Sequence, residues 1–360
     1  MSFKRFVKNF VAWFSELRKS QRKTLAALVY GLMKSRRVGV AAIARGIPGP
    51  VAQKHKIKLV DRFLGNNRVA IEKAVKPLIT WLANSTRKRL LIALDWTDLH
   101  DKKHQALFAS VILDTRAIPV LWRVVEKENP SYSQNQEEER LLEKLKEIIP
   151  QGIEAIILAD RGFGRVELFK KLEFLGFKYI IRVSGTAWID SEQFTGSLQR
   201  FPVRPNQLID FGRVLYHKKE KYPVRLIYQF APGQEEPWFL VTNLDWEAKR
   251  VPQGYGHRMD IEEKFKDFKN LRTGLGLHGV ILSAACRYER LLLVVVYAYF
   301  FLLLAGAYGE EKGYHRKLVA SSTTKRRVMG LWQVGYYVLK AFRVGCRRLL
   351  CLLPSLMPEI

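Results

Sequence analysis

The sequence predicts a protein of the α/β class, in which a core of strands and helices is flanked by helical regions. Three observations support this class. Residues 1–85 have apolar side chains at helical spacing among many lysines and arginines, strand-like apolar runs begin at residue 89, and residues 185–248 are rich in β-branched and aromatic side chains. The strands are therefore expected in the middle of the chain.

The first region, residues 1–86, is expected to be helical and basic. Within it, residues 38–64 have the pattern of a helix-turn-helix, in which Pro50 would begin the second helix and Lys54 and Lys58 would share a face. Such a unit reads DNA in many proteins. A plain basic helical bundle is the alternative that the same residues allow.

The core is expected to occupy residues 87–184 and 249–310. The predicted elements of its first part are strands at 91–94, 107–113 and 120–125, a helix at 136–149, a strand at 153–160, a helix at 165–175 and a strand at 179–183. Consecutive strands followed by alternating helices and strands, with acids at strand ends, are the order of a ribonuclease H-like fold.

Two further regions complete the expected organisation. Residues 185–248 predict an inserted β-rich subdomain, where Trp238 is a candidate for stacking on an unpaired base, with core or rim packing as the alternative. Residues 311–360 predict a basic helical tail, which suits contact with DNA or a second subunit.

The charge of the chain is unevenly distributed. Of the formal net charge of +27, residues 1–90 carry +18 and residues 311–360 carry +8, whereas residues 91–310 carry only +1. Basic flanks around a neutral middle favour a polyanionic partner that is held by the ends of the chain and processed in its middle. The three cysteines show no paired framework, which indicates a reducing compartment.

One stretch, residues 255–269, carries four polar side chains at helical spacing. On a helix with about 100° per residue, Tyr255, Arg258 and Lys269 all fall within about 40° of Glu262. A carboxylate on this stripe can hold a divalent cation, and the guanidinium, ammonium and phenol groups can bind phosphate oxygens. The stretch therefore suits a phosphate-handling site.

Two aspartates upstream stand at the ends of apolar runs, Asp95 after residues 89–94 and Asp160 after residues 153–159. A single aspartate at a strand end is commonly a cap or turn residue. Together with Glu262, however, they supply three carboxylates from separate elements, and such a set can bind two divalent metal ions that act on a phosphodiester bond.

These stretches resemble the signatures of a large group of bacterial insertion-sequence transposases, of the DDE type with a Tyr-Arg-Glu-Lys motif. The similar segments read LDWTDLH at residues 94–100, LADRGFG at 158–164 and YGHRMDIEEKFKDFK at 255–269. The resemblance runs from about residue 30 to about residue 275. It implies a ribonuclease H-like fold with an inserted subdomain and the activity of a DNA transposase.

The resemblance also implies roles for individual residues. The catalytic and metal-binding acids would be Asp95, Asp160 and Glu262, holding two Mg²⁺ ions for which Mn²⁺ substitutes. The phosphate-binding residues would be Tyr255, Arg258 and Lys269. The implied partners are the terminal inverted repeats of the element, target DNA, and a second copy of the chain in a synaptic homodimer, within the bacterial cytoplasm at the nucleoid and without a membrane.

Two alternatives stay open at the level of sequence. The chain could be an inactive transposase remnant that binds element ends as a repressor. It could also be a basic membrane protein anchored by residues 291–308, an uncharged run long enough to span a bilayer. Gly306 and three tyrosines in that run favour instead a helix buried behind the sheet.

Overall fold

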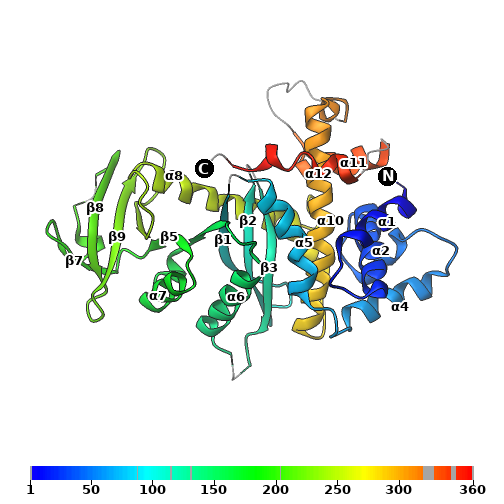
Figure 1. Ribbon diagram of the computed structural model, residues 1–360, viewed down its shortest axis with the longest axis horizontal. Helices are drawn as coiled ribbons and strands as arrows, with labels where there is room; N and C mark the ends of the chain where they lie inside the picture. Colours follow the sequence, from blue (N-terminus) through cyan, green and yellow to red (C-terminus); the bar gives the residue numbers. More distant parts are fainter. Residues whose placement is uncertain are drawn as a thin grey trace.

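The computed structural model describes residues 2–86, 88–113, 116–129, 132–202, 204–318, 328–341 and 346–358. Along its longest axis, a sheet occupies one side, a long helix stands beside the sheet, and a group of N-terminal helices lies beyond that helix (Figure 1). The α-helices of the described residues are α1 (Phe3–Trp13), α2 (Lys19–Ser35), α3 (Val40–Gly46), α4 (Gln53–Leu64), α5 (Ile71–Asn84), α6 (Gln134–Ile148), α7 (Val166–Phe174), α8 (Arg250–Gly256), α9 (Asp260–Lys269), α10 (Ala285–Glu311), α11 (Leu331–Ala341) and α12 (Cys346–Leu350).

A single ten-stranded sheet runs in the order β3-β2-β1-β4-β5-β10-β9-β8-β6-β7. Its strands are β1 (Arg89–Asp98), β2 (His104–Leu113), β3 (Arg116–Glu126), β4 (Glu154–Ala159), β5 (Lys178–Val183), β6 (Trp188–Asp190), β7 (Thr195–Ser197), β8 (Gln207–Tyr216), β9 (Tyr222–Phe230) and β10 (Trp238–Thr242). Strands β1, β2 and β3 pair antiparallel, whereas β4 pairs parallel with both β1 and β5. The strands predicted from the apolar runs are thus confirmed.

Residues 185–248 contain the strands expected of the β-rich insertion, and these strands are continuous with the core sheet. Strand β10 pairs antiparallel with β5, and β9 and β8 follow it, so the strands of this region continue the core sheet. The local pattern predicted strands here, but it could not indicate that they pair across a separation of about sixty residues with β5.

The two faces of the sheet carry different helices. Leu91 and Ala93 of β1 belong to an apolar cluster that includes Ile261 of α9. Leu90 and Ile92, which point the other way because side chains alternate along a strand, belong to the larger cluster that includes residues of α6 and α7. Helices α8 and α9 therefore cover one face, while α6 and α7 cover the other.

Helix α10 is buried at the centre of the molecule. It is 27 residues long, and it is apolar enough to cross a membrane by composition, but 94% of its most apolar window is buried inside the fold. Its rings pack on those of the N-terminal helices: Phe301 contacts Phe6 at 5.5 Å between centroids, and Tyr297 contacts Phe10 at 5.4 Å. The alternative of a membrane anchor finds no support in this packing.

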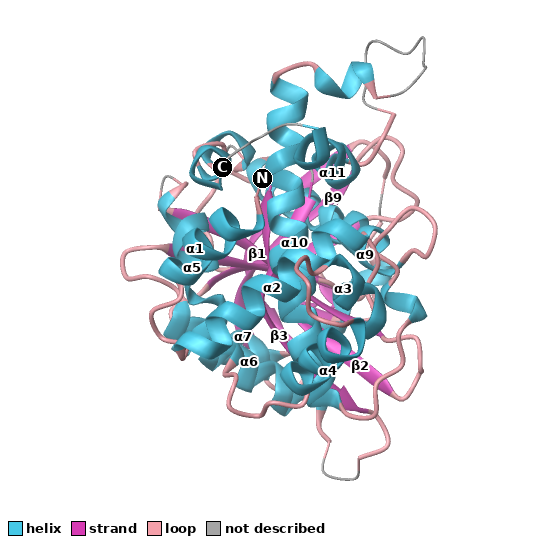
Figure 2. Ribbon diagram, turned by 90° about the vertical axis from the view of Figure 1, so that its right-hand side faces the viewer, coloured by secondary structure: helices cyan, strands magenta, loops and turns pink. Residues whose placement is uncertain are grey.

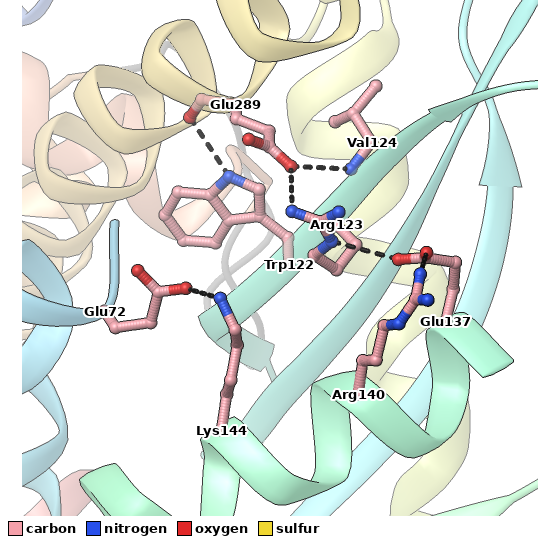
Figure 3. Close-up of polar contacts among 8 residues, drawn as sticks. All are labelled: Glu72, Trp122, Arg123, Val124, Glu137, Arg140, Lys144 and Glu289. Carbon is pink, nitrogen blue, oxygen red and sulfur yellow. Dashed lines mark hydrogen bonds and ion pairs between the residues drawn. The ribbon is translucent and has the colours of Figure 1, made fainter. Parts of the chain in front are cut away.

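A network of charged side chains ties α10 to the sheet and to α6 (Figure 3). Arg123 of β3 pairs with Glu137 of α6 at 3.1 Å and with Glu289 of α10 at 3.4 Å. Glu289 also accepts a hydrogen bond from the Val124 backbone N–H at 3.2 Å, and its own backbone carbonyl accepts one from Trp122 Nε1 at 3.0 Å. These contacts fix the position of α10 over β3.

Close helix crossings in the flanking regions depend on glycine. A Cβ added to Gly46 of α3 would lie 1.9 Å from the carbonyl oxygen of Gly31 in α2, and a Cβ added to Gly335 of α11 would lie 1.8 Å from that of Leu302 in α10. Helices α3 and α4 confirm the two predicted helices of residues 38–64. Helices α1, α2 and α4, which lie beyond α10 in Figure 1, are on the near side of the molecule in Figure 2. Helix α11 buries one face against α10, including Trp332 and Val338.

Candidate active site

The sheet brings Asp95 and Asp160 to one place. Strands β1 and β4 are parallel, with Ala93 opposite Leu158, so two residues further along Asp95 stands across from Asp160 on the same face. Both carboxylates turn toward one guanidinium: Arg258 Nη2 lies 3.6 Å from Asp95 Oδ1 and 3.4 Å from Asp160 Oδ2. The side chain of Asp95 is 19% exposed and that of Asp160 is 39% exposed, so the pair opens to solvent.

Asp160 is oriented by the turn that follows it. Its Oδ1 accepts a hydrogen bond of 2.9 Å from the backbone N–H of Gly162, at the start of the 3-10 turn η1 (Arg161–Phe163). This cap occupies one carboxylate oxygen and leaves the other, Oδ2, facing Arg258. The turn thus serves as a local cap while it presents the acid at the strand end.

The segment 255–269 is not the single continuous helix that the spacing predicts. A 3-10 turn, η3 (His257–Met259), joins α8 to α9. A 3-10 turn advances each residue by about 120° instead of about 100°, so three such residues rotate α9 by about 60° relative to α8. The spacing of polar residues could not reveal this change of pitch.

Glu262 consequently stands apart from the two aspartates. It is exposed on α9, and no ion pair or hydrogen bond is found for it within the described ranges. Among those residues there is also no group of three His, Cys, Asp or Glu side chains arranged to hold a metal ion. The predicted set of acids is therefore brought together only in part, as the pair Asp95 and Asp160.

Tyr255 lies under the site, against the sheet. It is 3% exposed, and its ring meets that of Trp238 edge-on at 4.9 Å between centroids. Burial raises the pKa of Tyr255 to about 12, an effect that the charges of Arg258 and Arg182 reduce and that those of Asp160 and Asp95 increase. Trp238 is half-buried and packs against Tyr255, and its stacking on an unpaired base stays a prediction.

Lys269 borders the site on the other side. Its Nζ donates a hydrogen bond to Thr97 Oγ1, two residues beyond Asp95 on the same face of β1. Burial lowers the pKa of Lys269, and the charges of Asp98 and Asp95 oppose that shift. The lysine is thus an enclosed cation beside the aspartate pair.

Three neighbours were missed by reasoning from the sequence. Thr97 could have been found, because alternation along the strand places it on the face of Asp95. Glu138 is fully buried beneath β1, where it accepts a hydrogen bond of 2.7 Å from Trp96 Nε1 and pairs with Arg165. It lies on a helix rich in charged residues, so the sequence did not distinguish it from a solvated acid. His278 lies near Lys269 only because the chain folds back after α9, which the sequence does not show. Lys54 and Lys58, by contrast, lie exposed on α4, as expected of a helix-turn-helix face.

The aspartate pair fits a divalent cation in the chemistry of its donors. Carboxylate oxygens are the ligands preferred by Mg²⁺, and here oxygens of two carboxylates already converge on one positive group. Arg258 provides a second indication: its Nε is buried with no hydrogen-bond partner among the residues that the structure describes. A buried N–H of this kind is costly unless an acceptor reaches it, and a phosphate oxygen is such an acceptor.

Comparison with known families agrees with this site. The family model for the transposase DDE domain matches residues 86–279, a segment that contains both aspartates and the whole stretch 255–269. The chain belongs to this family. Its members are DNA-acting enzymes of the nuclease and transposase kind that generally use divalent metal ions. No curated protein matches the chain.

Proposed function

We propose that the chain is a DNA transposase that cleaves DNA strands at the ends of its element and joins the released ends to target DNA, in a cut-and-paste reaction. The observation that carries this proposal is the convergence of Asp95 and Asp160 on Arg258, within the segment that matches the family. The sheet order β3-β2-β1-β4-β5 supports assignment of the core to the ribonuclease H-like class.

In this proposal the acids hold metal and the cations hold phosphate. Asp95 and Asp160, joined by Glu262 once α9 presents it, hold divalent ions, for which Mg²⁺ and Mn²⁺ are the candidates. When bound, such ions supply Lewis-acid activation of the attacking and leaving oxygens. Arg258 then passes from the aspartates to the phosphate beside the scissile bond, where its Nε gains the acceptor that it lacks.

Two more residues contribute to this proposal, Lys269 by contact with the phosphate and Tyr255 by support of Arg258. Lys269 is enclosed and held by Thr97, so the low local dielectric would strengthen its interaction with a phosphate. Tyr255 is buried and stays protonated at neutral pH, because its pKa lies at about 12. Its part is to support the segment that carries Arg258, in contact with Trp238.

The site is tested by measuring strand cleavage on a labelled duplex that carries an element end, with Mg²⁺. Asp95→Asn, Asp160→Asn and Glu262→Gln should each abolish cleavage and leave binding to the duplex in place, because they remove metal ligands while keeping side-chain shape. The matched control is Asp260→Asn, a neighbouring acid on α9 that pairs with His257 at 3.7 Å. This control should retain cleavage activity. If it loses as much cleavage activity as Glu262→Gln does, the assignment of Glu262 as a metal ligand is wrong.

A repressor that binds element ends without cutting them is the second candidate, and the observation in its favour is that Glu262 does not join the aspartate pair in a three-acid group among the described residues. The same assay separates the two, because a repressor would bind the ends and leave them intact at any Mg²⁺ or Mn²⁺ concentration. Synaptic pairing as a homodimer, a place at the nucleoid, and recognition of inverted repeats through residues 38–64 belong to the transposase proposal.

A further inference from the structure

A groove of about 540 Å³ lies between the end of α2 and α3, and cations line it. Lys34, Arg37 and Arg45 are all exposed at its rim, and Tyr30 forms part of its wall. The close crossing of α2 and α3 at their glycines brings these cations, from two helices and the turn between them, to one opening. The groove therefore concentrates positive charge.

This charge is not neutralised by the protein. The acids of residues 1–90 are three in number and bind cations outside the groove: Glu16 pairs with Lys76, Asp61 with Arg287 and Glu72 with Lys144. No ion pair within the described ranges involves Lys34, Arg37 or Arg45. An anion from outside the chain is the partner that such a groove accommodates.

The groove is joined to the candidate active site by a short segment after α9. The Val38 backbone N–H donates a hydrogen bond of 2.8 Å to the carbonyl of Leu275, and a Cβ added to Gly276 would lie 3.7 Å from Arg37 Cγ. Two residues later, His278 faces His100 at 5.6 Å between ring centroids.

The same segment brings His278 close to Lys269, which borders the candidate active site. Burial lowers the pKa of His278, and the nearby charge of Lys269 lowers it further, as does His100. Lys269 therefore lies at the aspartate end of this segment and Arg37 at the groove end, with His278 and His100 between them. A DNA strand that follows this segment would meet a lysine near the aspartates and an arginine at the groove, and both side chains can bind phosphate.

We propose that the groove of Lys34, Arg37 and Arg45 binds the phosphate backbone of the DNA duplex that leads away from the scissile phosphate. This inference rests on the proposed function. It states that the groove between α2 and α3 holds the DNA that lies next to the active site. It differs from the expectation that the exposed face of α4, with Lys54 and Lys58, holds the DNA.

The test measures binding of a mixed-sequence duplex of about 30 base pairs to the full chain without divalent ions, at several salt concentrations. The triple variant Lys34→Gln, Arg37→Gln and Arg45→Gln should lower the slope of log affinity against log salt by about 2–3, since each lost phosphate contact lowers it by about 0.9. The affinity should fall by on the order of a hundredfold at 0.1 M salt.

The matched control removes three exposed cations from α1 instead, as Lys4→Gln, Arg5→Gln and Lys8→Gln. It should change the slope by much less, because loss of net charge alone breaks no direct contact. An unchanged slope in the groove variant, or an equal change in the control, would overturn the proposal. Because binding is measured without cleavage, a wild-type chain that binds through the groove but never cuts would contradict only the proposed function.

A second arm uses vesicles of phosphatidylglycerol, whose phosphates offer the same charge on a membrane surface. The groove variant should bind them as the control does. If vesicle binding falls while the DNA slope stays unchanged, the groove serves a lipid surface and the proposal is wrong.

Discussion

Arg258 contacts both aspartates of the candidate site, and its own Nε has no acceptor among the described residues. The guanidinium therefore offsets the repulsion between two nearby carboxylates in the protein without bound ions. A divalent cation would compete with it for the same oxygens. Arg258 and divalent ions should therefore each stabilise the protein, and each should weaken the stabilising effect of the other.

We expect Arg258→Gln to lower the free energy of unfolding by about 1 kcal/mol without divalent ions, a modest value because Asp160 is 39% exposed to screening solvent. Added Mg²⁺ or Mn²⁺ should then raise the melting temperature of the variant more than that of the wild type, since the competing cation is gone. Differential scanning fluorimetry with and without the metal ion measures both effects.

Arg182→Gln is the matched control for this experiment. Arg182 has a similarly enclosed guanidinium, 18% exposed, that pairs with Glu236 at 2.7 Å. Its loss should lower the melting temperature but leave the response to metal ions as in the wild type. An equal response of Arg258→Gln and wild type to Mg²⁺ would contradict the competition.

Glu138 is a buried acid that holds both strand ends from below, through Trp96 next to Asp95 and through Arg165 after the η1 turn. Glu138→Gln leaves Arg165 enclosed without its counter-charge and should cost about 2–3 kcal/mol in urea unfolding. The double variant with Arg165→Met should recover much of that loss. A double variant as unstable as the sum of the single changes would show that the two residues act independently.

Among single residues, the sequence predicted the positions of the two aspartates better than it predicted the side chains that surround them. Asp95 and Asp160 were identifiable because each ends an apolar run, and the parallel strands then bring them together. The separation of Glu262 depends on the pitch of three residues, and the burial of Glu138 depends on which face of α6 meets the sheet. Neither is encoded in local spacing.

Helix α11 shows how a flanking element is fixed. The backbone of α11 at Gly335 touches that of α10, because a Cβ there would lie 1.8 Å from the Leu302 carbonyl oxygen. We expect Gly335→Ala to push the helices apart and to lower the free energy of unfolding by about 1–3 kcal/mol. Thermal unfolding followed by circular dichroism measures this cost.

Gly256→Ala provides the comparison, since Gly256 ends α8 with helical dihedral angles, and a Cβ added there would meet no described heavy atom within 4 Å. Alanine at this position should be neutral or stabilise by about 0.4–1 kcal/mol, because it restricts the unfolded chain. If both alanines cost the same, intrinsic backbone effects rather than the helix contact would explain Gly335.

For helices and strands, the periodicity of the sequence predicted their positions along the chain but not which strands pair or which helices pack together. The strands of residues 185–248 were expected, but their continuity with the core sheet through the pairing of β10 with β5 was not. The tail was expected to be helical, but the burial of Trp332 of α11 against α10 was not foreseen, and contact of the tail with DNA or a second subunit stays a prediction. Both outcomes depend on contacts between distant segments, which a local pattern does not contain.

For the molecule as a whole, buried tyrosines make stability sensitive to high pH. Burial raises the pKa of four of them to about 12: Tyr216, Tyr222, Tyr255 and Tyr288. An unfolded tyrosine ionises near pH 10, so their contribution is fully present below about pH 10 and is lost as the pH rises toward 12. Urea unfolding should therefore give a smaller free energy at pH 11 than at pH 9.

Tyr216→Phe tests the cause. It removes the hydrogen bond from Tyr216 Oη to the Gly164 carbonyl at 2.9 Å, so it should be less stable than the wild type at pH 9. Its loss of stability between pH 9 and pH 11 should nevertheless be smaller, by roughly 1 kcal/mol. The same loss in both proteins would assign the alkaline sensitivity to other groups.

The central position of α10 also has a consequence for the order of events during synthesis. Phe6 and Phe10 leave the ribosome early, but the rings that cover them, Tyr297 and Phe301, are made almost three hundred residues later. Until then the first helices pack on one another but lack the cover that α10 provides, and the apolar surface left open favours aggregation or binding by a chaperone. Folding of the N-terminal helices is thus completed only when most of the chain exists, and a copy of the gene interrupted before α10 would yield a product that cannot bury its first helices.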